Sequence, residues 1–152
     1  SAMQGMLQII GIALTIFLCS CSSRPSGYEG YMTRPYTVRG ESYEPMSVKA
    51  ALKFEETGTC SWYNESSFFG IRRGNTSIGE KVMPGTTGAH KTLPLPCLVK
   101  VTNLENSKSL NIRINDRGPW GKGRIIDISY AAAREIGMHR SGTARVKLEL
   151  LD

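Results

Sequence analysis

The sequence lacks the residue clusters that bind a zinc ion or a nucleic acid. It has four cysteines and two histidines in 152 residues, with no Cys-x-x-Cys pair and no clustered histidines. No Lys/Arg run is typical of a nucleic-acid-binding tract, and no paired aromatic motif suggests stacking on bases. We therefore expect no metal, no cofactor and no nucleic-acid partner.

Charge is absent from the start of the chain, where no charged residue precedes Arg24. The whole chain is nevertheless basic, with 19 Lys and Arg against 13 Asp and Glu and a pI of about 9.3. Such a surface attracts anionic partners, among them nucleic acid, an anionic membrane or an acidic polysaccharide. A surface that only keeps the protein soluble is equally consistent with this charge.

No apolar run is long enough for a comfortable membrane span. Residues 7–18 are almost wholly apolar, which is the length of a signal-peptide core. The run ends in Leu18-Cys19-Ser20-Cys21, which resembles a bacterial lipobox with Cys21 in the lipidated position. We predict a lipoprotein signal peptide over residues 1–21. The alternative is a buried apolar helix or strand. Residues 1–3, Ser-Ala-Met, resemble residues left by cloning.

Lipidation at Cys21 would place the protein at a bacterial membrane by its lipids. Ser22 follows the cysteine rather than an aspartate, which favours the outer membrane, facing the periplasm. Export would leave Cys60 and Cys97 as an even pair in an oxidising compartment, so we predict a disulfide between them. The alternative is two buried thiols that act as small apolar residues.

Helical patterns are equally scarce. Residues 22–34 resemble a tether, residues 35–46 an extended arm and residues 47–56 a short helical turn. The one convincing helix runs from Ser129 to Ile136, with Ser129 as its N-cap and Gly137 just past its end. Alternating or β-prone segments occur at residues 58–63, 97–102, 110–114 and 143–150. Several short strands with one helix predict a mainly β fold, a small closed barrel rather than an α/β sheet.

The stretch from residue 110 to residue 128 combines a strand with a candidate catalyst. Its first apolar run breaks at residues 115–119 and resumes at residues 125–128. Asp116 lies at the break, beside Arg117 and a Gly-Pro turn, so its carboxylate is expected to be held in one place. A carboxylate fixed in this way is either a catalyst or an aspartate that caps a turn.

Several motifs, in this order, closely resemble the rare lipoprotein A family of bacterial envelope lipoproteins. The matching segments are Pro-Tyr-Thr-Val-Arg-Gly at 35–40, Gly-Thr-Cys-Ser-Trp-Tyr at 58–63, Ala-His-Lys-Thr-Leu-Pro-Leu-Pro at 89–96, Val-Thr-Asn-Leu at 101–104, Ile-Asn-Asp-Arg-Gly-Pro at 114–119 and Gly-Arg-Ile-Ile-Asp-Ile-Ser-Tyr-Ala-Ala-Ala at 123–133. The resemblance implies a six-stranded double-psi β-barrel domain over residues 35–152. One or two short helices and an extended N-terminal arm would accompany the barrel.

The resemblance also implies a septal-ring lytic transglycosylase that acts on peptidoglycan glycan strands. Such an enzyme cleaves the bond between MurNAc and GlcNAc and leaves a 1,6-anhydro-MurNAc end. Because the sugar's own C6 hydroxyl is the nucleophile, one carboxyl group can serve as acid and base. The family pattern assigns catalytic positions to Asp116, His90 and Glu80. Between Glu80 and His90, however, the loop is one residue short and lacks the family's usual aromatic and aspartate.

The other site residues follow from these assignments. Asp116 must hold a proton to act as an acid, so we expect the Arg117 guanidinium to point away from its carboxylate. His90 could orient Asp116 or bind sugar hydroxyls, and Glu80 could tune Asp116 or bind substrate. Candidate substrate-binding residues are Trp62, Tyr63, Arg117 and Trp120, with at least one of the aromatic residues expected in the core. The alternative functions are an expansin-like barrel that binds glycan without cleaving it and an envelope scaffold.

Overall fold

A computed structural model describes residues 31–64, 75–81 and 85–151 of the chain. The predicted signal peptide, Cys21 and the first part of the predicted tether lie outside the described residues. In the part of the chain that is described, no helix has the length and apolar character needed to cross a membrane.

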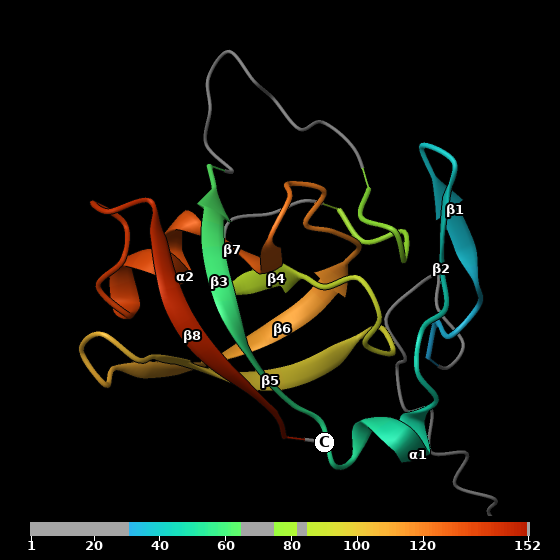
Figure 1. Ribbon diagram of the computed structural model, residues 1–152, viewed down its shortest axis with the longest axis horizontal. Coiled ribbons are helices and arrows are strands. Elements are labelled where there is room, and N and C mark those ends of the chain that lie inside the picture. Colours follow the sequence, from blue (N-terminus) through green and yellow to red (C-terminus); the bar gives the residue numbers. More distant parts are fainter. Residues whose placement is uncertain (1–30, 65–74, 82–84, 152) are drawn as a thin grey trace, which may run out of the picture.

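Six strands close into a barrel (Figure 1). Around the barrel the order is β3-β7-β4-β6-β5-β8, in which β3 pairs parallel with β7 and β4 pairs parallel with β6. The other neighbouring pairs are antiparallel. The bounds are Glu55–Tyr63 for β3, Thr87–Ala89 for β4, Cys97–Asn103 for β5, Ser109–Asp116 for β6, Arg124–Ser129 for β7 and Thr143–Leu150 for β8. The predicted mainly β, closed six-stranded architecture is confirmed.

Two connections cross over neighbouring strands. Residues 117–123 carry the chain from β6 to β7, although β4 lies between these two strands in the barrel. The chain between Tyr63 and Thr87 likewise joins β3 to β4, which lie on either side of β7. Each crossing therefore joins two strands that are not paired with each other and that lie on either side of a third strand. Asp116 is the last residue of β6, where one of these crossings begins.

The barrel interior is filled by the apolar residues that alternate along its strands. Ile112 and Ile114 on β6 are fully buried, as are Val99 and Val101 on β5. The short strand β4 passes close to its neighbours: a Cβ on Gly88 would lie 3.1 Å from the Asp127 carbonyl oxygen and 3.1 Å from the Ile114 side chain. No alternation in the sequence indicates β4, because three residues carry too little periodicity to reveal a strand.

Two short helices accompany the barrel. Helix α1, Val48–Ala51, has Ser47 as its N-cap, and helix α2, Tyr130–Glu135, has Ser129. The Ser129 hydroxyl accepts the Ala132 N–H at 3.2 Å, which satisfies a donor that the helix itself leaves unpaired. Gly137 follows α2 with a φ of 71°, a conformation that glycine adopts without strain.

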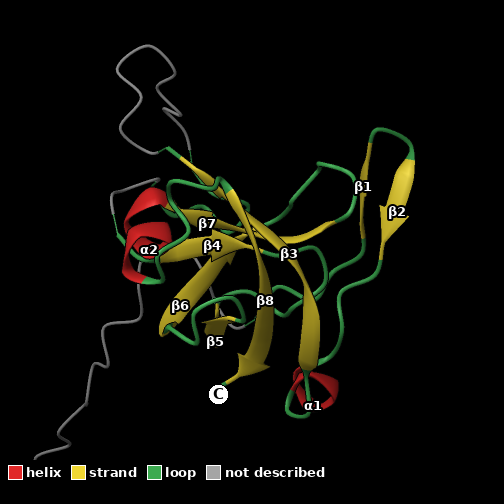
Figure 2. Cartoon of the chain, turned by 60° about the vertical axis from the view of Figure 1, so that its left-hand side comes forward, coloured by secondary structure: helices red, strands yellow, loops and turns green. Residues whose placement is uncertain are grey.

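The N-terminal arm is not simply extended but forms a β-hairpin. Strands β1, Tyr36–Val38, and β2, Glu41–Tyr43, pair antiparallel and put Tyr36 opposite Tyr43. The two-residue turn has positive φ at Arg39 and Gly40, 52° and 81°, as a hairpin turn that matches strand twist requires. Figures 1 and 2 both show the hairpin beside the barrel and not within its sheet.

The predicted disulfide between Cys60 and Cys97 is absent, and both residues are free, buried thiols. Their strands, β3 and β5, are not neighbours in the barrel, since β8 separates them on one side. The Cys60 thiol donates a hydrogen bond to the Ser61 carbonyl oxygen at 3.3 Å. Burial raises the pKa of the Cys60 thiol and raises that of Cys97 to about 12. The alternative interpretation, small apolar core residues, is therefore the one that the structure supports.

Candidate active site

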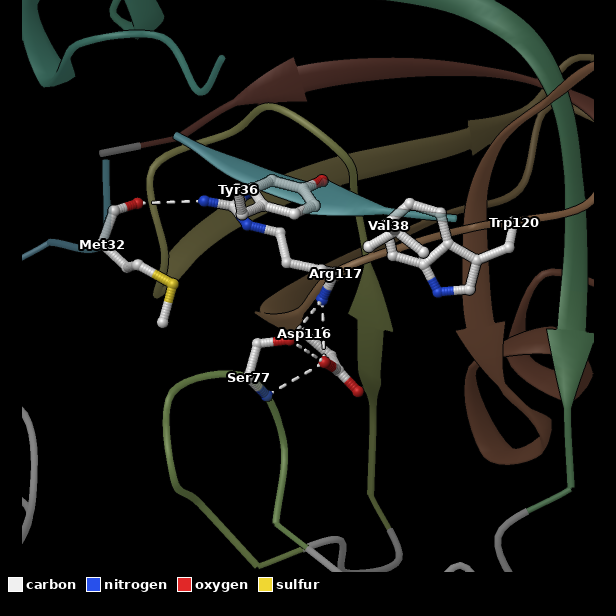
Figure 3. Close-up of a pocket in the computed structure, with 7 residues that line it drawn as sticks. All are labelled: Met32, Tyr36, Val38, Ser77, Asp116, Arg117 and Trp120. Carbon is white, nitrogen blue, oxygen red and sulfur yellow. Dashed lines mark hydrogen bonds between the residues drawn. The ribbon is translucent and has the colours of Figure 1, made fainter. Parts of the chain in front are cut away.

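The Asp116 carboxylate is held by three hydrogen-bond donors at the end of β6 (Figure 3). Its Oδ1 atom accepts from the Ser77 hydroxyl at 2.5 Å, the Ser77 N–H at 3.0 Å and the Arg117 N–H at 2.8 Å. No described residue bonds to Oδ2, and Figure 3 shows Oδ2 pointing away from Ser77. The described residues thus orient the side chain through Oδ1 and leave Oδ2 free to contact a ligand.

Ser77 is a site residue that the sequence did not reveal. It lies in a turn in which the Thr76 N–H donates to the Glu80 carbonyl at 2.7 Å and the Gly79 N–H to the Thr76 carbonyl at 2.9 Å. A serine in a polar, glycine-containing loop is too common to mark a function. Only the fold, which brings this turn against the end of β6, makes Ser77 a partner of Asp116.

The His90 side chain does not contact Asp116. Its Nδ1 accepts the N–H groups of Thr92 and Leu93, each at 3.1 Å, and its Nε2 lies 3.3 Å from Oε2 of Glu56. Because Nδ1 accepts two bonds, the ring proton belongs on Nε2, where it is donated to Glu56. The link to Asp116 is through the backbone, in which the His90 N–H donates to the Asp116 carbonyl at 3.0 Å.

Glu80 forms hydrogen bonds with two residues of β6, Arg113 and Asn115, whose positions alternate with that of Asp116 along the strand. Its Oε1 pairs with the Arg113 guanidinium and its Oε2 accepts from Nδ2 of Asn115 at 3.0 Å. Burial opposes ionisation of Glu80, but the hydrogen bonds from Arg113 and Asn115 and the Arg113 charge outweigh it and lower the pKa of Glu80. A carboxylate held ionised in this way anchors the turn that carries Ser77, and it is a poor proton donor.

Arg117 points away from the Asp116 carboxylate, as predicted. Its guanidinium donates to the carbonyl oxygens of Leu93 at 2.5 Å and Met32 at 3.0 Å, and it lies 5.3 Å from the centre of the Tyr36 ring. The residue is buried, with 8% of its surface exposed. Its guanidinium thus joins the N-terminal arm to the loop before β5, and the substrate-binding role of Arg117 stays a prediction.

A pocket of about 400 Å³ opens at Asp116. Its wall combines side chains of the arm, the Ser77 turn and the start of the 117–123 crossing (Figure 3). The lining residues are Met32, Tyr36, Val38, Ser77, Asp116, Arg117 and Trp120. Within the described ranges, no three His, Cys, Asp or Glu side chains are close enough together to hold a metal ion.

The geometry agrees with comparison to known families. Residues 55–148, more than half of the chain, match the double-psi β-barrel family described as lytic transglycolase. The chain belongs to this family. The double-psi barrel predicted from the sequence is thereby confirmed, and so is the resemblance to rare lipoprotein A.

Individual members of the lytic transglycolase family are also similar to the chain. The endolytic peptidoglycan transglycosylase RlpA of Pseudomonas aeruginosa is 48% identical over 118 residues, which cover 78% of this chain and 33% of the relative. The Vibrio cholerae protein of the same name is 46% identical over 127 residues, covering 82% of this chain and 46% of that one. The chain thus spans from one third to about half the length of these curated relatives.

Solved structures with low sequence identity to this chain share its fold. The apo-expansin of Clavibacter michiganensis has a TM-score of 0.51 and 14% identity, with 65% of this chain and 51% of that chain covered. The Streptomyces papain inhibitor has a TM-score of 0.50 and 17% identity, with 65% and 96% covered. At these identities the likeness concerns the barrel and not its activity.

Of the aromatic residues predicted to bind substrate, only Trp120 lines the pocket at Asp116. Trp62 packs on Tyr130 with ring centres 4.9 Å apart and is part of the core boundary. The Tyr63 hydroxyl lies 2.9 Å from Oγ1 of Thr87. Neither lines the Asp116 pocket, whereas Trp120 does and is 37% exposed. Among these three aromatic candidates, Trp120 is the one that lines the pocket at Asp116.

Proposed function

We propose that this domain is a peptidoglycan lytic transglycosylase that cleaves between MurNAc and GlcNAc and leaves 1,6-anhydro-MurNAc ends. The observation that carries the proposal is a single carboxyl group, Asp116, in a pocket at the barrel rim with one oxygen anchored and one open. The family and the names of the relatives support the same reaction class.

The reaction needs one group that first gives and then takes a proton. Three donors make Oδ1 of Asp116 an acceptor, so a proton on this carboxyl group belongs on Oδ2. From there it is transferred to the glycosidic oxygen as the bond to C1 of MurNAc breaks. The C6 hydroxyl of the same sugar attacks C1, and its proton returns to Oδ2. No water is consumed, and the carboxyl group ends in its starting state.

His90 and Glu80 act as positioning residues in this proposal. The His90 N–H holds the backbone of Asp116, while its ring fixes the loop at residues 90–93. Glu80 fixes the turn that presents Ser77 to Asp116. Both residues therefore act on the carboxylate through their neighbours, which accounts for their family positions without a direct contact.

The test is digestion of purified glycan strands followed by mass spectrometry. We expect products one water lighter than hydrolysis products, and we expect Asp116→Asn to abolish them while leaving the fold intact. Glu105→Gln is the control, because it removes an exposed carboxyl group that does not line the pocket. Absence of anhydro products at high protein concentration would contradict the proposal.

The second candidate is a barrel that binds glycan without cleaving it. It is favoured by one observation: neither the Glu80 nor the His90 side chain, to which the family pattern assigns catalytic positions, reaches the Asp116 carboxylate. Retention of the protein on glycan strands, without any anhydro product, would select this candidate. A scaffold would show neither retention nor product.

We also propose that the protein is anchored by lipid at Cys21 in the outer membrane, facing the periplasm. The support is the apolar run at residues 7–18 followed by the lipobox-like residues and Ser22. Cells given radiolabelled palmitate should label the wild-type protein and not a Cys21→Ala variant. Recovery of an unlabelled wild-type protein in the soluble fraction would contradict the anchor.

A further inference from the structure

The arm before the barrel supplies part of the pocket around Asp116. Three of the seven lining residues, Met32, Tyr36 and Val38, come from it. The segment that matches the family begins only at residue 55. Without the arm, the barrel would therefore lack one wall of the pocket.

The arm is fixed to the barrel beside the catalytic residue. The Met32 N–H donates to the Leu95 carbonyl at 2.6 Å, and the Tyr36 hydroxyl donates to the Lys91 carbonyl at 2.6 Å. Arg117 adds its bond to the Met32 carbonyl at 3.0 Å. Arg117 directly follows Asp116 in the chain. The residue that binds the arm is therefore adjacent to the candidate acid. The position of the hairpin is thus coupled to that of Asp116.

The hairpin carries two aromatic rings that contact Trp120. Tyr36 and Tyr43 are register partners and stack with centres 5.2 Å apart at 19°. Tyr43 lies 5.4 Å from Trp120 at 59°, and Tyr36 lies 6.2 Å from it at 73°. The Tyr36 ring also contacts Arg117, whereas Trp120 remains 37% exposed in the pocket. The two tyrosine rings therefore pack against the indole of Trp120 and hold it in place. Of the three rings, the indole is the one most exposed to solvent.

We propose that the β1–β2 hairpin positions Trp120 as a stacking surface for one sugar ring of the glycan, next to the bond at Asp116. This rests on the function proposed above. A sugar ring has a face of C–H groups that packs on an aromatic ring while its hydroxyls stay in water. Among the described residues, the charged side chains in the pocket wall are Asp116 and Arg117, and the Arg117 guanidinium is engaged with carbonyls. The wall therefore suits an uncharged ring better than an anionic peptide.

The kinetic test uses the full chain and glycan strands stripped of peptides. Tyr43→Ala and Trp120→Ala should each raise KM about tenfold, the size of one aromatic contact, while kcat changes by less than about twofold. Trp120→Phe should restore part of the loss, and Tyr43→Phe, which keeps the ring, should behave as wild type. Leu104→Ala is the matched control, because Leu104 is 46% exposed but does not line the pocket.

A binding test leaves the hairpin unchanged. The protein has two tryptophans, so a Trp62→Phe variant makes Trp120 the only indole reporter. Stripped glycan strands should shift its fluorescence emission to the blue and saturate. Unchanged emission at saturating glycan, or wild-type KM in both alanine variants, would overturn the proposal. If the wild-type chain makes no anhydro product, the transglycosylase proposal fails, and the titration still decides whether Trp120 binds sugar.

Discussion

At the scale of single residues, the site depends on how one carboxyl group is held. Asp116 receives three donors on Oδ1, two of them from Ser77. The sequence predicted Asp116 as the centre because a carboxylate at a strand end is fixed. It could not predict Ser77, because the two residues lie 39 positions apart in the chain and only the fold brings them together.

Replacement of Ser77 tests this arrangement. Ser77→Ala removes the 2.5 Å hydroxyl bond to Asp116 and keeps the backbone bond. We expect kcat on glycan strands to fall by about ten- to a hundredfold, since small displacements of a catalytic group have effects of this size. Ser109→Ala is the control, because Ser109 is exposed at the other end of β6. A Ser77→Ala variant with wild-type kcat would show that the hydroxyl does not position Asp116.

The two buried thiols give a second prediction. Burial raises the pKa of Cys97 to about 12 and that of Cys60 as well. At pH 8 the thiolate of Cys97, which is the reactive form, is therefore about 10⁴-fold scarcer than its thiol. In the folded protein, peptide mapping after iodoacetamide treatment should find Cys60 and Cys97 unmodified, whereas both should react in guanidinium chloride. A disulfide-linked peptide containing both residues would contradict the structure.

At the scale of elements, the structure joins short pieces to the barrel through side chains. The Ser77 turn is tied to β6 by Glu80, and the hairpin is tied to the loop before β5 by Arg117 and Tyr36. The longer strands and helix α2 follow from alternation and capping in the sequence. Strand β4 and the hairpin do not, because three-residue strands have too few positions to show a period.

The ion pair of Glu80 predicts a pH dependence for the turn at residues 75–81. Because folding lowers the pKa of Glu80 below its ordinary value of 4.5, the ionised side chain stabilises the folded state fully above about pH 4.5. That stabilisation is lost as the pH falls through the lower, folded pKa. Wild type should therefore exceed Glu80→Gln in free energy of unfolding at pH 7, by urea denaturation, and the difference should vanish at low pH. A difference that is constant with pH would mean that charge is not its source.

At the scale of the whole molecule, barrel closure depends on how closely β4 fits between β6 and β7. Gly88 has no side chain, and a Cβ there would press on the Asp127 carbonyl and on Ile114 at 3.1 Å. The neighbouring strands can move apart only by disturbing the core that they enclose. The shortest strand is in this way as important to closure as the longer ones.

Gly88→Ala should destabilise the protein by about 1–3 kcal/mol, the range for overpacking a well-filled interior. Thermal unfolding followed by circular dichroism should show a lower Tm. Gly85→Ala is the matched control, since a Cβ at Gly85 would meet no atom within 4 Å. Equal Tm values for the two variants would show that β4 has room to move.

The sequence by itself determined the family, the mainly β barrel and the candidate Asp116. These follow from local patterns: alternation, caps, and motifs in a fixed order. Only the tertiary structure decided that Cys60 and Cys97 are free, that Ser77 holds Asp116, and that the arm folds back as a hairpin beside Trp120. The physical reason is that these contacts join residues distant in the chain, and their partners are set by strand order and register.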